Sequence, residues 1–171
     1  MKNYIIKYKN QIISYLFAVG LGILFHFLYD LLNKPLILAP FLPIDESVFE
    51  HLKLLFYPIY IVSIVEGVIL KKNLPSFIAS RIIAVIASSI LLVILYYIIW
   101  FINDGEGVEI ISIISYFVFM LTTYIISENF QEEYKENRTF IYTGIVIMFV
   151  YILFLTFFTY YKPDVDFFIN K

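Results

Sequence analysis

Five long apolar stretches, separated by short polar breaks, constrain the fold of this chain more than any other feature of its sequence. They cover residues 11–32, 52–70, 78–101, 109–127 and 140–161. A helix needs about 20 mostly apolar residues to cross the hydrocarbon core of a bilayer. Because 61% of the residues are hydrophobic and only 15% are charged, a water-soluble fold of this size would expose too much apolar surface. The pattern predicts an all-α transmembrane bundle of five spans, in a single integral membrane domain over residues 1–171.

Basic residues predict how these spans are oriented. Cytoplasmic ends of membrane proteins carry an excess of Lys and Arg. If the N-terminus is cytoplasmic, eight of the 12 basic residues lie inside and four lie outside. The inner group is Lys2, Lys7, Lys9, Lys71, Lys72, Arg81, Lys135 and Arg138, and the outer group is Lys34, Lys53, Lys162 and Lys171. We therefore expect a multi-pass protein of the cell membrane with its N-terminus inside and its C-terminus outside.

Charge and residue usage exclude several functions and suggest partners. A net charge of −2 gives no case for nucleic-acid binding, and the lack of cysteine excludes disulfides, thiolate nucleophiles and cysteine-ligated zinc. The lipid bilayer is the first expected partner. Ser80, Ala84 and Ser88 repeat every four residues, and such small residues let another helix approach closely. That helix belongs either to the same bundle or to a second copy or another membrane protein.

Ionisable residues gather where the first expected helix ends and the second begins. His26 and Asp30 are four residues apart and share one face of the first helix. Glu46, Glu50 and His51 lie at the start of the second helix, which antiparallel packing brings to the same level. Ionisable side chains at membrane depth are costly and suggest a function by default. We expect these five side chains to form a polar site at the extracytoplasmic face.

Histidine with carboxylate is the ligand set of a zinc site that keeps one position open for water. Such a metal makes hydroxide available for hydrolysis near neutral pH. We expect His26, Asp30 and His51 to bind a divalent metal such as zinc, and Glu46 or Glu50 to act as general base. Successive helical residues point about 100° apart, so Glu50 and His51 cannot easily bind one ion. The pattern favours His26 and Asp30 with either the two glutamates or His51.

Other interpretations of these polar residues stay open. Ser47 and Glu50 form a capping-box pattern where the second helix should start, and Lys53 can pair with Glu50. The cluster would then be purely structural, or it would relay a proton or a substrate. Glu66 and Arg81, near the inner ends of the second and third spans, are expected either to pin these two helices or to form a gate.

The stretch from Glu46 to Pro58 resembles a known family. With Asp45 before it, this stretch is similar to an N-E-S-V-W-E-H-L-K-L-L-F-x-P pattern, in which Asp45 replaces Asn and Phe49 replaces Trp. The chain resembles an uncharacterised family of small bacterial and archaeal integral membrane proteins, classed as a domain of unknown function. Relatives commonly end in a P-H-x-P-x-F-like stretch, where this chain has Asp164 in place of the His. The resemblance implies a similar plan of five spans and implies no activity.

Three functions are compatible with these features. The first is a metal-binding, hydrolase-like membrane protein that acts on a lipid or another envelope substrate. The second is a small transporter or an ion- or proton-binding accessory subunit, with Glu66 and Arg81 as its inner gate. The third is a non-catalytic scaffold or partner protein. Polar residues confined to one end favour an enzyme site, whereas polar residues along the bundle axis favour transport.

Overall fold

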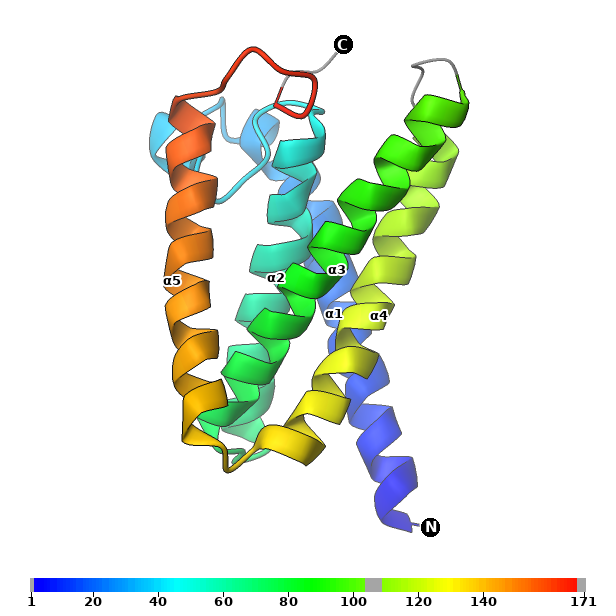
Figure 1. Ribbon diagram of the computed structural model, residues 1–171, viewed down its shortest axis with the longest axis vertical. Helices are drawn as coiled ribbons and strands as arrows, with labels where there is room; N and C mark the ends of the chain where they lie inside the picture. Colours follow the sequence, from blue (N-terminus) through cyan, green and yellow to red (C-terminus); the bar gives the residue numbers. More distant parts are fainter. Residues whose placement is uncertain (1, 104–108, 169–171) are drawn as a thin grey trace.

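The computed structural model describes residues 2–103 and 109–168, which form five long helices and one short 3₁₀ helix and contain no strand (Figure 1). The long helices are α1 (Lys2–Leu31), α2 (Val48–Ile69), α3 (Leu74–Ile102), α4 (Glu109–Tyr134) and α5 (Arg138–Tyr160), and the 3₁₀ helix η1 is Leu36–Leu38. All five long helices are long and apolar enough to cross a membrane. The expected all-α bundle of five spans is therefore confirmed.

Helix boundaries differ from the expected ones at the polar segments. α4 continues to Tyr134 instead of ending at residue 127, and only residues 135–137 separate it from α5. The ring of Tyr134 stacks on Phe140 of α5 with centroids 4.9 Å apart, which supports the extra turns. Hydropathy marks where a chain leaves the lipid, but a helix continues into water for as long as its own contacts support it.

α2 is the most enclosed of the five helices. Of its most apolar part, 61% is buried, against 17–28% for the other four. α2 packs directly against α1 and α3. It reaches α5 through aromatic rings, with Phe56 5.0 Å from Tyr151 and Phe49 5.7 Å from Phe154 between centroids. The other helices expose many large apolar side chains, which is the arrangement expected of a bundle surrounded by lipid.

Small residues bring α3 close to its neighbours. Ser80, Ala84 and Ser88 are fully buried, so this stripe serves packing within the bundle and is not exposed to a second copy. Gly144 of α5 lies so near α3 that an added Cβ would be 2.6 Å from the Cβ of Ala79. Close approach at small residues is the usual basis of helix packing in membranes.

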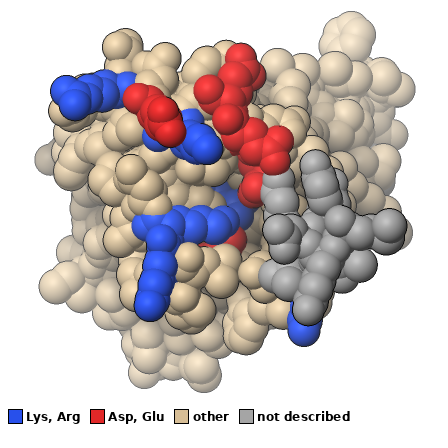
Figure 2. Space-filling model, turned by 90° about the horizontal axis from the view of Figure 1, so that it is seen from below, with Lys and Arg blue, Asp and Glu red and all other residues tan. Residues whose placement is uncertain are grey.

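The two ends of the bundle carry different polar structures. At the upper end in Figure 1, the loop of residues 32–47 with η1, the start of α2 and the segment after α5 lie together. At the lower end the α2–α3 and α4–α5 connections meet, and Figure 2 shows basic and acidic side chains side by side on that face. We name these the outer end and the inner end, after the orientation expected from the sequence.

Candidate metal centre

Three of the five expected site residues meet at the outer end. The ligand atoms of His26, Glu46 and His51 all lie within 4.8 Å of one another. His51 Nε2 is 3.4 Å from one carboxylate oxygen of Glu46, and His26 Nε2 is 3.8 Å from the other. Two ligands of a tetrahedral zinc ion, each at about 2.0–2.1 Å, lie roughly 3.3 Å apart. The distance between His51 and Glu46 is therefore close to that of a metal site, whereas His26 faces the other Glu46 oxygen and lies further away.

Each ligand comes from a different element. His26 projects from α1, Glu46 ends the loop before α2, and His51 lies in the first turn of α2. Ser47 is the N-cap of α2, and its side-chain oxygen accepts a hydrogen bond from the backbone N–H of Glu50 at 3.4 Å. This cap fixes where the helix begins. It thereby sets how His51 lies relative to Glu46.

Hydrogen bonding fixes the tautomer of His51. Its Nδ1 lies 2.8 Å from the backbone carbonyl oxygen of Ser47. A carbonyl only accepts hydrogen bonds, so Nδ1 carries a hydrogen, and in the neutral ring Nε2 presents a lone pair to the Glu46 carboxylate. A lone pair that faces a carboxylate oxygen is stable only with a proton or a metal cation between them. Metal-binding histidines commonly donate their other N–H to a backbone carbonyl in the same way.

Glu46 is the ionised and open part of the cluster. The hydrogen bond with His51 holds the pKa of the Glu46 carboxyl below its ordinary value, and the nearby charge of His26 acts in the same direction against partial burial. The group is therefore a carboxylate at neutral pH, as a metal ligand must be. Its side chain is 59% exposed, which leaves the cluster accessible to water or to a substrate.

His26 brings an unsatisfied nitrogen to the cluster. Its ring centroid lies 5.9 Å from that of His51 and 4.8 Å from that of Phe27. Its Nδ1 is buried and has no hydrogen-bond partner among the residues that the structure describes. An unsatisfied buried nitrogen costs free energy, so a bound ion or a water molecule that contacts this ring would be stabilising.

Asp30 and Glu50, the other two expected site residues, are not part of the cluster. Asp30 is exposed and pairs with Lys34, one turn further along, at 3.1 Å. Glu50 is fully buried, and its carboxylate pairs with Lys53 at 2.7 Å and with Lys162 at 3.0 Å. Oε2 of this carboxylate faces Lys53 and Oε1 faces Lys162, so neither oxygen is directed at the cluster without a cation beside it. The role of general base that the sequence suggested for Glu50 is therefore not favoured by its surroundings.

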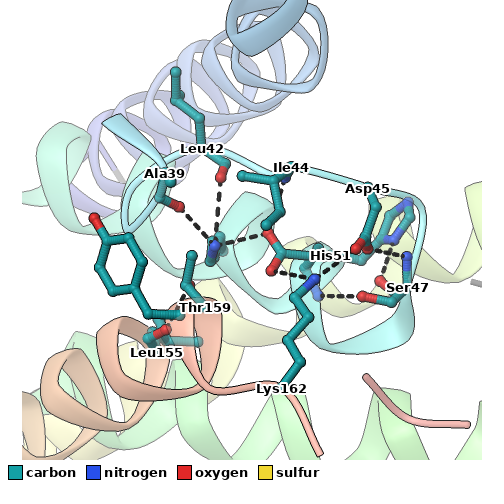
Figure 3. A network of polar contacts seen from close by, with 12 residues as sticks. Ala39, Leu42, Ile44, Asp45, Ser47, His51, Leu155, Thr159 and Lys162 are labelled. Atoms are coloured by element: carbon teal, nitrogen blue, oxygen red, sulfur yellow. Dashed lines mark hydrogen bonds and ion pairs between the residues drawn. The ribbon is translucent and has the colours of Figure 1, made fainter. Parts of the chain in front are cut away.

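Lys162 and Asp45 border the cluster, although no sequence pattern predicts them as part of the site. Lys162 Nζ donates to Asp45 Oδ2 at 2.5 Å, and Figure 3 shows it reaching across from the segment after α5. Burial alone would raise the pKa of Asp45, but hydrogen bonds from Lys162 and Ser47 outweigh it and lower that pKa. No periodicity relates residue 162 to residue 45, so only the folded chain reveals this contact.

Glu66 and Arg81 form an ion pair at the inner end, with the Arg81 Nη2 atom 3.0 Å from Glu66. The second carboxylate oxygen of Glu66 lies 3.1 Å from Lys72 Nζ. Arg81 also donates to the Ser127 hydroxyl at 2.5 Å, and its guanidinium lies 4.1 Å from the centre of the Tyr124 ring. These contacts join α2, α3 and α4. The role of the pair as a gate stays a prediction.

Comparison with known proteins identifies the family of this chain but no activity. The model of a family of unknown function, DUF6512, matches residues 1–171. No curated protein and no solved structure matches the chain. Because the family model covers every residue of the sequence, the chain belongs to the family of unknown function DUF6512.

Proposed function

We propose that this chain binds a divalent metal such as zinc through His26, Glu46 and His51, and that it acts as a membrane-embedded hydrolase. The observation that carries the proposal is the approach of His51 Nε2 to a Glu46 carboxylate oxygen, at 3.4 Å, beside the ring of His26. A cation at this place would neutralise the carboxylate and use both rings. Two imidazoles with one carboxylate are a ligand set of catalytic zinc sites.

The open side of the cluster supports hydrolysis over a purely structural metal site. Three protein ligands leave one position of a tetrahedral zinc ion for water, whose pKa falls to about 7 when it is bound. The resulting hydroxide would attack an ester or a phosphoester of a lipid or another envelope molecule. Glu50 is paired with Lys53 and Lys162 and is not proposed as general base. The metal itself would therefore have to generate this hydroxide by lowering the pKa of its bound water.

Charge distribution supports an extracytoplasmic position for the cluster. Lys53 and Arg81 are fully buried and pair within the bundle. Without these two, seven basic residues remain on the inner side and three on the outer side. The bias agrees with the positive-inside rule, so we place the N-terminus inside, the C-terminus outside and the cluster at the outer face of the cell membrane.

Metal content tests the proposal. We would measure zinc and other divalent ions by elemental analysis in the detergent-purified protein and in the variants His26→Ala, His51→Ala and Asp30→Ala. We expect about one zinc per chain in the wild type and in Asp30→Ala, the matched control, and loss of zinc in both histidine variants with helical content unchanged. A wild-type protein that binds no metal even after incubation with zinc would refute the proposal.

Buried hydroxyls favour a second candidate function, transport of an ion or a proton. The hydroxyls of Tyr57, Ser63 and Ser88 are buried along α2 and α3 without hydrogen-bond partners among the described residues. Internal water would satisfy them, and Ser63 lies three residues before Glu66 of the Glu66–Arg81 pair on α2. Zinc or proton flux into liposomes that Glu66→Gln abolishes would favour transport, whereas a hydrolase would show no such flux.

A further inference from the structure

The segment after α5 docks on the part of the chain that carries two of the three proposed metal ligands. The backbone N–H of Phe49, in the first turn of α2, donates to the carbonyl oxygen of Phe167 at 3.0 Å. Phe168 is buried, and its ring centroid lies 4.9 Å from that of Phe49 and 4.9 Å from that of Phe158. We call residues 162–168 the tail.

Lys162, at the start of the tail, holds both carboxylates that neighbour these ligands in the sequence. Its Nζ lies 2.5 Å from Asp45, directly before Glu46, and 3.0 Å from Glu50, directly before His51. Figure 3 shows this side chain running from the tail to the labelled Asp45, with His51 close by. One ammonium group thus contacts the residue before Glu46 and the residue before His51, and restrains the distance between them.

Asp45 connects Lys162 to the first residues of α2. Its second carboxylate oxygen accepts from the backbone N–H of Ser47 at 2.9 Å, and the Ser47 carbonyl oxygen accepts from His51 Nδ1. Lys162, Asp45, Ser47 and His51 therefore form one continuous chain of polar contacts. Glu46 stands between Asp45 and Ser47 in the sequence, on backbone outside the helix. Its side chain is largely exposed, so the position of Glu46 depends on these two neighbours.

We propose that Lys162 is a positioning residue for the metal site, so that docking of the tail sets the metal affinity; this inference rests on the proposed function. Ordering a loop residue costs conformational entropy. If docking of the tail already orders the loop, metal binding does not have to order it, and the metal binds more tightly. Without the ammonium group, Asp45 loses its partner and Glu46 gains freedom.

Zinc affinity of matched lysine variants tests this role. Lys162→Met removes a half-buried lysine that pairs with the buried Glu50 at 3.0 Å, and Lys72→Met removes a half-buried lysine that pairs with the buried Glu66 at 3.1 Å. Both variants lose a similar ion pair, but only the first lies at the outer end. We expect Lys162→Met to bind zinc about tenfold more weakly in competition with a chromogenic chelator, and Lys72→Met to stay within about twofold of the wild type.

Two further variants separate positioning from general stability. Lys162→Arg keeps the positive charge and is expected to restore most of the zinc affinity. Asp45→Asn weakens the same contact from the other side, and it keeps the proposal testable if Lys162→Met fails to fold. The double variant is expected to lose less zinc affinity than the two single losses combined, because both substitutions remove the Lys162–Asp45 contact.

The outcomes distinguish the two proposals. A wild type that binds no zinc overturns the metal site and the positioning role together. A wild type that binds zinc, with Lys162→Met and Asp45→Asn equally tight, overturns the positioning role alone. Equal losses in Lys162→Met and Lys72→Met would also overturn it, because affinity would then follow stability and not tail docking.

Discussion

At the scale of single residues, each buried or half-buried charge at the outer end has a partner of opposite sign. Asp45 and Glu50 contribute two negative charges, and Lys53 and Lys162 contribute two positive ones. Lys53, which is fully buried, also donates to the backbone carbonyl of Ala39 at 2.8 Å. A buried ammonium group is tolerated only when it is paired and hydrogen-bonded, so these contacts explain how a lysine is accommodated inside the first turns of α2.

Replacing Lys53 with Met is expected to lower the free energy of unfolding by about 1–3 kcal/mol, because Glu50 loses the nearer of its two lysines and keeps Lys162. Chemical unfolding in detergent micelles measures the change. The control is Lys34→Met, which breaks the exposed pair with Asp30 and should cost about 0–1 kcal/mol. Equal stability of the two variants would contradict the assigned role of Lys53.

Ser63→Ala is expected to leave stability unchanged or to raise it by up to about 1 kcal/mol, because the buried Ser63 hydroxyl has no partner within residues 2–103 and 109–168. Ser80→Ala is the matched control, since its hydroxyl donates to the carbonyl oxygen of Ser76 at 2.9 Å. Thermal unfolding in detergent compares the two. A clear loss of stability in Ser63→Ala would indicate that an internal water molecule bonds to this hydroxyl.

At the scale of elements, the sequence predicts the spans well because lipid imposes their length and composition. It also predicts Ser47 as the start of α2, since capping is local. It does not predict how far α4 extends, because the stacking of Tyr134 on Phe140 is a contact between two helices. Local rules apply along one helix, and they do not determine which side chains a neighbouring helix will support.

The candidate site shows the same limit. His26, Glu46 and His51 could be expected together because consecutive helices bring their ends to one level. Asp30 shares the face of His26, but four residues place it about 6 Å further along the axis, and it pairs with Lys34 instead. The contact of Lys162 with Asp45 spans 117 positions, a separation at which a single sequence carries no periodic pattern.

Acid is expected to release the tail from the start of α2. The pKa of Asp45 in the folded protein lies below its ordinary value of 3.8. The ionised carboxylate therefore contributes stability above that value, and this contribution is lost as the pH falls through the lowered pKa. Hydrogen exchange at the Phe49 amide, which donates to the carbonyl oxygen of Phe167, should accelerate in that range. Asp45→Asn should remove the pH dependence, and an unchanged pH response in this variant would contradict the explanation.

At the scale of the whole molecule, α2 is the helix around which both polar ends are organised. Its first turns carry Glu50 and Lys53, and its last turns carry Glu66 with Arg81 and Lys72 beside it. Between these ends it is covered by α1, α3 and the aromatic rings of α5. The bundle therefore encloses one helix that has charged groups buried at two levels.

The orientation of the bundle can be measured directly because the chain has no cysteine. Lys34→Cys places a thiol at the outer end, and Glu136→Cys places one in the α4–α5 connection. A membrane-impermeant thiol reagent is expected to label the Lys34→Cys variant in intact cells and the Glu136→Cys variant only after permeabilisation. The reverse pattern would place the metal cluster on the cytoplasmic side.

The buried charges of α2 also dictate an order of assembly. During synthesis α2 emerges before Arg81 of α3 exists and long before Lys162 does. Before α3 is made, Glu66 would have only Lys72 as a partner and would lack Arg81, so α2 is expected to stay beside the insertion machinery until α3 joins it. Glu50 gains its second lysine only after the fifth helix has left the ribosome. The outer end, and with it the proposed metal site, is then completed only after all five helices have been made.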